Sequence, residues 1–427
     1  MVPRMRRPTL AAVAAVAALS FSTLALAPPA DAAPSHGHAR HNVHVCSQAT
    51  PGHAACQAIR SDPAAAGAAA PAGTVYAAGA VSAAGAVTPL ATTVPATAKT
   101  PADIRSAYGL SGTSHGKTVA IVDAYNAPTA EADLGVYRKQ FGLPPCTTAN
   151  GCFRKVSQSG STTRLPRNDG GWAQEISLDL DMVSAACPDC KILLVEASSS
   201  SFANLAAGVT YAASQPGVVA ISNSYGGGDQ SGTSSVAAAY KQPGIAVTAS
   251  TGDNGYGIAA PASFSTVIAV GGTSLYGSIS GGWTESAWNG AGSGCSTLNA
   301  NPGYQVGTAC PGKATADVSA VADPNTGVAV YDSYSYQGQS GWMQFGGTSA
   351  ASPIIASIYA QGTAAPGKGS ATYPGATTWA RYSADQTLLN DVVNGSNGTC
   401  PSATWCNAGP GWDGPTGLGT PRGPGAF

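Results

Sequence analysis

Short apolar runs rich in β-branched residues alternate with longer segments of helical periodicity from about residue 117 onward. The runs that predict strands are 117–125, 191–197, 217–225, 244–250 and 266–272. The segments that predict helices lie around 130–141, 173–186, 203–214 and 234–241, with another from Ser349. Buried strands that alternate with helices are typical of the α/β class, here a doubly wound, mostly parallel sheet flanked by helices.

Polar residues follow several of these predicted strands. Asp123, Asp253 and the loop 222–229 all fall at predicted carboxyl ends. Active sites in open α/β sheets gather outside the carboxyl ends of their strands. We therefore expect the chemistry of the protein at this edge of the sheet.

The first 97 residues have a different composition. Residues 1–32 combine a basic start, an apolar run and an Ala-Asp-Ala cleavage site, which predicts a secretory signal peptide. Residues 33–97 are rich in Ala, Pro, Val and Thr, so we expect a low-complexity linker or a short propeptide. Residues 98–427 carry the sharper pattern and form the predicted main domain. No later segment is long and apolar enough to predict a membrane span.

Export to an oxidising compartment favours disulfides, and the ten cysteines fall into close pairs. The simplest connectivity joins Cys46 to Cys56, Cys146 to Cys152, Cys187 to Cys190, Cys295 to Cys310, and Cys400 to Cys406.

The formal net charge is −1 and only 10% of residues are charged, which excludes a basic nucleic-acid-binding face. We expect a secreted monomer.

The segment GWMQFGGTSAASP, residues 341–353, is typical of a nucleophilic serine at the start of a helix. A serine hydroxyl needs a neighbouring base before it can attack. Five of the six histidines lie near the N-terminus, and only His115 follows them. Histidine is the usual base for such a serine, and this sequence therefore offers few candidates for that role at Ser349.

Glu175 and Asp179 offer another base. They stand four residues apart on the predicted helix 173–186, so their carboxyl groups share one face beside an apolar stripe. Like charges at this spacing cost helix stability unless the two groups share a proton. From this segment alone, an ordinary solvated helix face stays the alternative. Asp253 lies in a Gly-Asp-Asn-Gly turn, and turn formation alone also accounts for an aspartate there.

Taken together, these motifs resemble the sedolisin family, the serine-carboxyl peptidases whose fold is subtilisin-like. The resemblance covers about residues 100–427 and includes TPADIRSAY, E-x-x-x-D, STGDNG, ADVSAVADPNTG, GGTSAASP and NAGPGWDGPTGLGTP. It implies a peptidase with Ser349 as nucleophile and Glu175 as general base. It further implies that Asp179 supports that base and that Asp253 donates to the oxyanion.

The resemblance also implies one structural calcium ion in the C-terminal region. The matching positions are Asp391, Val392, Gly409, Gly411 and Asp413, with the valine and the glycines contributing carbonyl oxygens. Carboxylates and carbonyls are the ligands that Ca²⁺ takes.

The function that we expect is hydrolysis of protein or peptide substrates in acid, by an endopeptidase rather than a tripeptidyl-peptidase. Two alternatives stay open. One is a subtilase-like peptidase that uses Asp123, His115 and Ser349. The other is a catalytically silent binding or cell-surface protein on a peptidase scaffold.

Overall fold

The computed structural model describes residues 40–63, 90–230 and 232–427, together with Met1. The predicted signal peptide, apart from Met1, lies outside the described residues. The described helices and strands all belong to one compact unit, Ala39–Phe427. No helix among the described residues is long and apolar enough to cross a membrane.

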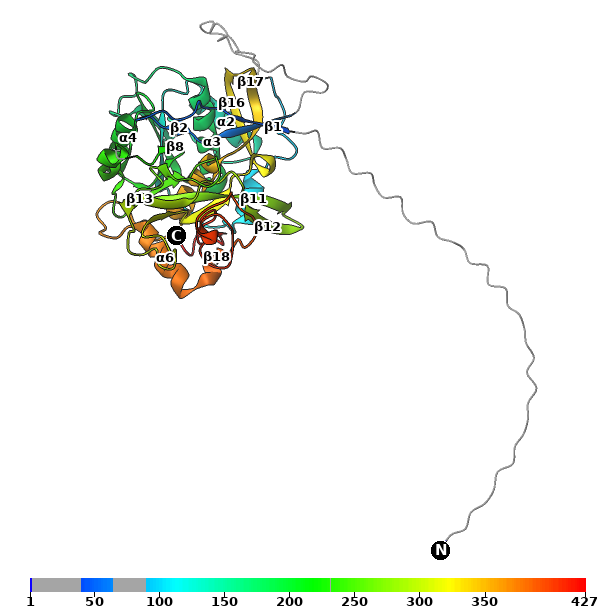
Figure 1. Cartoon of the computed structure of the whole chain (residues 1–427). Helices are drawn as coiled ribbons and strands as arrows, with labels where there is room; N and C mark the ends of the chain where they lie inside the picture. Colours follow the sequence, from blue (N-terminus) through cyan, green and yellow to red (C-terminus); the bar gives the residue numbers. More distant parts are fainter. Residues whose placement is uncertain (2–39, 64–89, 231) are drawn as a thin grey trace, which may run out of the picture. The chain divides into compact units, whose positions relative to one another are not determined.

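A mostly parallel sheet forms the centre of this unit (Figure 1). Its strands are β4 (Thr118–Ala124), β5 (Phe153–Ser157), β6 (Lys191–Ala197), β7 (Val218–Asn223), β9 (Ala246–Ser250), β11 (Ile268–Ser278), β12 (Gly282–Ala287) and β15 (Val318–Val321). They lie in the order β12-β11-β9-β7-β4-β6-β5, with β15 parallel to β11. Only β12, at the edge, is antiparallel to its neighbour. The predicted fold class is confirmed.

The described residues form six α-helices, of which the third, fourth and fifth along the chain pack against this sheet. The six are α1 (Pro101–Ala107), α2 (Ala130–Gln140), α3 (Gly170–Ala186), α4 (Phe202–Ser214), α5 (Thr348–Gln361) and α6 (Pro374–Ala384). Four short 3-10 helices are η1 (Thr233–Tyr240), η2 (Pro324–Thr326), η3 (Gln386–Leu388) and η4 (Ala403–Trp405). The predicted helix at 234–241 is thus wrong in type. Gly232 gives η1 no side-chain cap, and Pro243 follows closely, so a longer α-helix cannot form there.

The burial of helix α3 differs most from what the sequence led us to consider. We considered a solvated face for Glu175 and Asp179, yet every residue from Gly171 to Ala186 is buried. Helix α3 packs against α5, β16 (Val328–Tyr336) and α2, which leaves no face for solvent. The two acids are therefore inside the protein.

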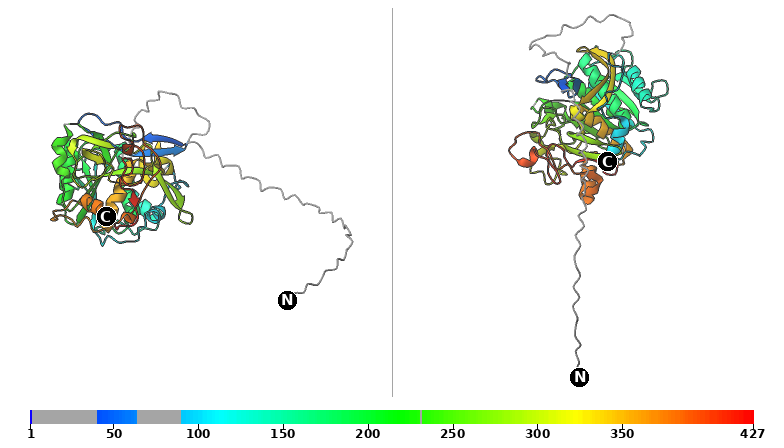
Figure 2. Two further views of the ribbon diagram at one scale, coloured as in Figure 1. Left: turned by 60° about the horizontal axis from the view of Figure 1, so that its bottom comes forward. Right: turned by 90° about the vertical axis from the view of Figure 1, so that its right-hand side faces the viewer.

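Smaller sheets surround the central one. Their remaining strands are β1 (Arg40–His44), β2 (Ala55–Cys56), β3 (Ile59–Pro63), β8 (Tyr225–Gly228), β10 (Ala259–Ala260), β13 (Gly294–Ala300), β14 (Gly312–Thr315), β17 (Gln339–Gly346), β18 (Leu389–Asn390) and β19 (Thr420–Pro421). The order β1-β3-β17-β16 places residues 40–63 beside the β16–β17 hairpin (Figures 1 and 2). Strand β2 lies on β8, whose other neighbour is β10. Part of the segment predicted as linker or short propeptide is thus built into this unit.

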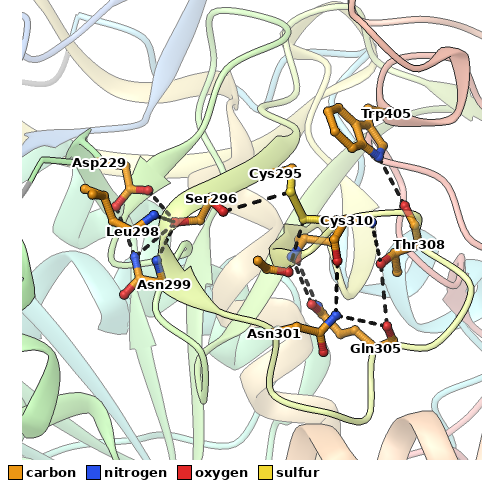
Figure 3. Close-up of a disulfide and its surroundings, with 12 residues drawn as sticks. Asp229, Cys295, Ser296, Leu298, Asn299, Asn301, Gln305, Thr308, Cys310 and Trp405 are labelled. Atoms are coloured by element: carbon orange, nitrogen blue, oxygen red, sulfur yellow. Dashed lines mark hydrogen bonds between the residues drawn. A yellow bond between two sulfur atoms is a disulfide. The ribbon is translucent and has the colours of Figure 1, made fainter.

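All five predicted disulfides are present. The Cys295–Cys310 bridge closes the β13–β14 region (Figure 3). Nearby, Ser296 Oγ and Asn299 Nδ2 donate to the Asp229 carboxylate at 2.7 and 3.1 Å. These bonds hold the loop that follows β8, one wall of the site described next.

Candidate active site

Ser349 is the second residue of α5 and is fully buried. Gly347, just before the helix, has a φ of 92°. A Cβ there would lie 2.1 Å from the Gln57 carbonyl oxygen and 2.6 Å from Asp253 Oδ2. Glycine is required at 347 for both reasons, since other residues are strained at this φ and would collide with these oxygens. The sharp turn directs Ser349 toward α3.

Pro353 shapes the backbone at the serine. It lies inside α5 and has no N–H for the carbonyl of Ser349, four residues earlier. Ser224 Oγ lies 3.3 Å from that carbonyl oxygen instead. The proline thus leaves an acceptor that ties β7 and β8 to the start of α5.

The Ser349 hydroxyl contacts a carboxylate. Its Oγ donates to Glu175 Oε2 at 2.8 Å and lies 3.2 Å from the Ser224 carbonyl oxygen. One turn along α3, both carboxylate oxygens of Asp179 accept from Ser224 Oγ, at 2.7 and 2.8 Å. Ser349, Glu175 and Asp179 therefore meet around Ser224, although the serine is distant in the chain from the two acids.

Burial sets the electrostatics of this group. Desolvation, and then the charge of neighbouring Asp179, raise the pKa of Glu175 well above its ordinary range. The pKa of Asp179 is raised by desolvation and by Asp123, against the lowering effect of its bonds to Ser224 and Glu175. Because crowded acids cannot all ionise, the pair retains a proton over a wide pH range.

Asp123, at the end of β4, is a third acid of this cluster. It is fully buried, and its carboxylate accepts no hydrogen bond from any residue that the structure describes. Burial and the charge of Glu196 raise its pKa strongly. His115, its predicted partner in the subtilase-like alternative, is exposed, and its ring contacts Thr113 Oγ1. The contact that Ser349 makes is with Glu175.

Asp253 lies shortly after β9, on the other side of the serine. Its Oδ1 accepts from the Thr348 N–H at 2.7 Å and from Thr348 Oγ1 at 2.8 Å. Its Oδ2 is buried and has no hydrogen-bond partner within the described part of the chain. Burial raises the pKa of Asp253 to about 7, although the two bonds from Thr348 lower it. In acid, Oδ2 therefore carries a proton that is free to be donated.

A cavity of about 610 Å³ lies beside Asp253. It is lined by residues 226–228 and 251–259, and by His44 and residues 46–49 and 55–57 of the N-terminal segment. Tyr225, in the loop expected at the edge of the sheet, points into the core, where its hydroxyl contacts Asn223 and Tyr240. The glycines that follow it line the cavity.

The sequence did not indicate several members of this site. Ser224 bridges Asp179 to the backbone of Ser349, and Thr348 holds Asp253 in place. Gln57 contributes a carbonyl oxygen next to Gly347. No local pattern marks these residues, although Ser224 falls in the loop expected at the edge of the sheet.

The predicted calcium ligands lie together near the C-terminus. Asp391 Oδ2 accepts from Gly411 N at 2.8 Å, and Asp413 Oδ2 accepts from Gly409 N at 3.1 Å. Burial raises the pKa of Asp413 to about 7, and Asp391 adds to the rise. Neither acid forms an ion pair with the cationic side chains that the structure describes.

This donor set fits a hard cation, because two carboxylates without a positive partner lie near enough for the charge of one to affect the other, beside glycine-rich backbone. The described residues hold no group of three or more His, Cys, Asp or Glu side chains suited to a metal. A cation here would therefore need backbone carbonyl oxygens as well as the two acids.

Comparisons with known proteins agree with this arrangement. The model of the subtilase family matches residues 162–405. Kumamolisin from Bacillus sp. (strain MN-32) is 28% identical over 359 residues, which are 75% of this chain and 61% of kumamolisin. Sedolisin from Pseudomonas sp. (strain 101) is 35% identical over 178 residues, 39% of this chain and 29% of sedolisin. The chain thus spans less than two thirds of either relative.

A solved structure of Pseudomonas sedolisin, a serine-carboxyl proteinase complexed with two molecules of pseudo-iodotyrostatin, superimposes with a TM-score of 0.65. It is 27% identical, and the match covers 76% of this chain and 95% of that one. The chain belongs to the subtilase family and, within it, to the sedolisins.

The raised pKa of Asp253 predicts a pH-dependent stability. Unfolded aspartate loses its proton near about pH 4, whereas folded Asp253 keeps it to about pH 7. The stabilisation from this shift is complete below about pH 4 and is lost as pH rises to about 7. Relative to Ser349→Ala/Asp253→Asn, the Ser349→Ala protein should lose roughly 4 kcal/mol of unfolding free energy across that window. Denaturant unfolding at several pH values measures this, and parallel curves for the two proteins would contradict the assignment.

Proposed function

We propose that this protein is a secreted, acid-acting serine-carboxyl peptidase that hydrolyses peptide bonds through an acyl-enzyme on Ser349. The observation that carries the proposal is the 2.8 Å hydrogen bond from Ser349 Oγ to the buried Glu175 carboxylate. A nucleophile in contact with its base, oriented by a third group, is the arrangement that activates serine. Five disulfides within the described residues support an extracellular location.

The chemistry begins when Ser349 Oγ attacks the substrate carbonyl carbon and Glu175 takes the hydroxyl proton. Asp179 holds the proton of the acidic pair, which leaves the Glu175 carboxylate able to accept the proton of Ser349. The proton then passes to the leaving amine as the C–N bond breaks. Water, activated by Glu175 in the same way, hydrolyses the ester of Ser349.

Negative charge develops on the substrate oxygen during both steps. The Ser349 N–H and the protonated Asp253 Oδ2 lie on the side where this charge forms, next to Gly347. Fixed donors in a buried site stabilise such an oxyanion more than water does. When Asp253 ionises, it can no longer donate and repels the oxyanion.

An endopeptidase is favoured by the course of the protein's own chain near the serine. Gln57 lies at the oxyanion position, and the chain upstream of it continues past the site. Ala54 N donates to Ser200 O at 2.8 Å, and His53 forms a bridge with Ser201. A tripeptidyl-peptidase needs a barrier three residues before the cut, whereas here a fourth residue and more are accommodated.

A catalytically silent binding protein is the second candidate that we considered. A silent descendant would be expected to lack a member of the site, whereas the nucleophile, base, supporting acid and oxyanion donor are all present.

We further propose that one Ca²⁺ stabilises the C-terminal region through Asp391, Asp413 and the carbonyls of Val392, Gly409 and Gly411. This ion would supply structural cross-linking and take no part in the chemistry.

Substitutions at the nucleophile and its base should abolish turnover. We expect Ser349→Ala and Glu175→Gln each to lower kcat/KM by at least about a thousandfold, because the two residues act as a unit. His115→Ala is the matched control and should stay within about twofold of wild type. The assay is hydrolysis of denatured casein or a peptide in acid, with circular dichroism to show that the fold is kept. Wild-type turnover by Glu175→Gln would refute the proposed base.

The pH profile should report on Asp253. Activity is expected to decline as pH rises past about 7, because the raised pKa of Asp253 places its ionisation there. Asp253→Asn retains a donor that cannot ionise, so its residual activity should lack this decline. Asp253→Ala should be slower by about 10²–10³-fold, the usual effect of losing one oxyanion donor. A wild-type maximum near pH 8, or full activity in Asp253→Ala, would contradict the role.

Calcium removal should lower thermal stability rather than alter the serine site. In the Ser349→Ala background, which avoids self-digestion, a chelator should reduce Tm by about 3–5 °C. Asp413→Ala should be less stable and insensitive to the chelator, whereas the exposed Asp385→Ala should respond as the parent does. Calorimetry with and without Ca²⁺ tests this, and an unchanged Tm after complete removal would count against the site.

A further inference from the structure

The turn that carries Asp253 contains three glycines. Gly252, Gly255 and Gly257 have φ values of 124°, 74° and 153°, a region that glycine enters freely. Glycine leaves a chain more conformational freedom than any other residue, so this turn has little rigidity of its own. A group at an active site that is misplaced by about 1 Å can cost about a hundredfold in rate. The position of Asp253 therefore depends on what holds residues 252–257.

A second piece of chain, residues 290–293, binds this turn and is called the support segment below. The Gly292 N–H donates to the Gly252 carbonyl oxygen at 2.8 Å. The Gly255 N–H in turn donates to the Gly290 carbonyl oxygen, also at 2.8 Å. These bonds join backbone to backbone, so any movement of the support segment is passed directly to the turn.

Ser293, at the end of the support segment, makes the remaining contacts with the turn. Its N–H donates to the Gly257 carbonyl oxygen at 3.1 Å, and the Gly257 N–H donates to the Ser293 carbonyl oxygen at 2.9 Å. Ser293 is fully buried, and its Oγ donates to the Trp405 carbonyl oxygen at 2.5 Å. The support segment is therefore bound between the turn that carries Asp253 and the C-terminal region.

Asn397 binds both the support segment and the turn. Its Nδ2 donates to the Ala291 carbonyl oxygen at 2.6 Å and to Ser293 Oγ at 2.8 Å. Its own carbonyl oxygen accepts from the Tyr256 N–H at 2.9 Å. A Cβ on Gly255 would lie 2.6 Å from that oxygen, so glycine at 255 allows the close approach. One buried residue, 3% exposed, thus connects the two pieces of chain.

The amide of Asn397 suits this place better than an acid would. Both hydrogens of Nδ2 are donated, whereas Oδ1 is buried and has no hydrogen-bond partner in the described part of the chain. Burying an unpaired acceptor is unfavourable, so the gain lies in the two bonds that Nδ2 donates. An ionised aspartate of the same shape could donate neither bond and would repel the Ala291 carbonyl oxygen.

We infer that Asn397 is a positioning residue for the proposed reaction, because it fixes the support segment against the turn and so sets where Asp253 meets the oxyanion. This inference rests on the proposed function, since Asp253 is the oxyanion donor only in that reaction. Thr348 bonds Asp253 Oδ1 from the other side. With both supports in place, Oδ2 is held in one direction. With Thr348 alone, the backbone behind the side chain is free to shift.

The first test asks whether Asn397 holds the turn, with no need for activity. Hydrogen exchange is followed in the full chain carrying Ser349→Ala. Adding Asn397→Ala should accelerate exchange at the amides of Tyr256 and Gly257 at least about tenfold, whereas the amides of β4 should keep their rates. Asn394→Ala is the matched control, because Asn394 also precedes a glycine in the same loop but is exposed. It should leave exchange at the turn unchanged.

A milder variant takes the place of Asn397→Ala if that protein does not fold. Ser293→Ala removes one of the two acceptors of Asn397 Nδ2 and the bond to Trp405, and it leaves the bond to Ala291. It should accelerate exchange at the turn by about threefold or more, with circular dichroism to show that the fold is kept. Unchanged exchange in folded Ser293→Ala would then count against the role of Asn397.

The second test asks whether Asn397 acts through Asp253. In the catalytically intact chain, Asn397→Ala should lower kcat for a peptide substrate in acid at least about tenfold, and Asn394→Ala should not. In the Asp253→Ala background the same change should cost less than about threefold, because a donor that is absent cannot be misplaced. The decline of activity with rising pH should also begin at lower pH in Asn397→Ala. Water that reaches a loosened turn weakens the desolvation that raises the pKa of Asp253.

The outcomes separate this inference from the proposed function. Equal losses from Asn397→Ala in the wild-type and Asp253→Ala backgrounds, or unaccelerated exchange at the turn, would overturn the inference while leaving the peptidase intact. Absence of hydrolysis in every protein, the unaltered chain included, would instead contradict the proposed function, and the exchange data would still decide whether Asn397 holds the turn.

Discussion

The burial of acidic side chains around one serine hydroxyl is the constraint on which the rest of the structure depends. Glu175, Asp179, Asp123 and Asp253 are all buried, and none forms an ion pair with a cation in the described part of the chain. Charged carboxylates are costly in such a place, so most of them hold protons instead. This single effect raises the pKa values of the acids at the site.

The fold supplies the burial from several directions. Helix α3 brings the acidic pair, α5 brings the serine, and the ends of β4, β7 and β9 bring Asp123, Ser224 and Asp253. Special backbone features complete the site, since Gly347 leaves room for two oxygens and Pro353 releases the carbonyl that Ser224 contacts. Neither the acids nor the serine would have these properties on an exposed surface.

The same geometry explains why residues 40–63 bind where they do. One edge of β8 and the N–H of Ser349 bind residues 55–57 of the protein's own chain. Pairing with β8 and β17 on either side of the serine, and the disulfide before Gln57, favour that position over free movement. The backbone groups around the serine therefore also hold this N-terminal segment.

The sequence determined much of this by itself. Hydrophobic periodicity predicted the central strands and most helices, because core faces must be apolar, and the close spacing of the cysteines predicted all five bridges. Motifs around Ser349, Glu175 and Asp253 placed the chain among the sedolisins. The sequence did not predict the solvent exposure of α3, the type of η1 or the position of residues 40–63. Burial of the two acids depends on what packs over a helix, and the docking of Gln57 depends on a strand edge far away in the chain. Only the tertiary structure decided these, because contacts between distant segments leave no periodicity in either one.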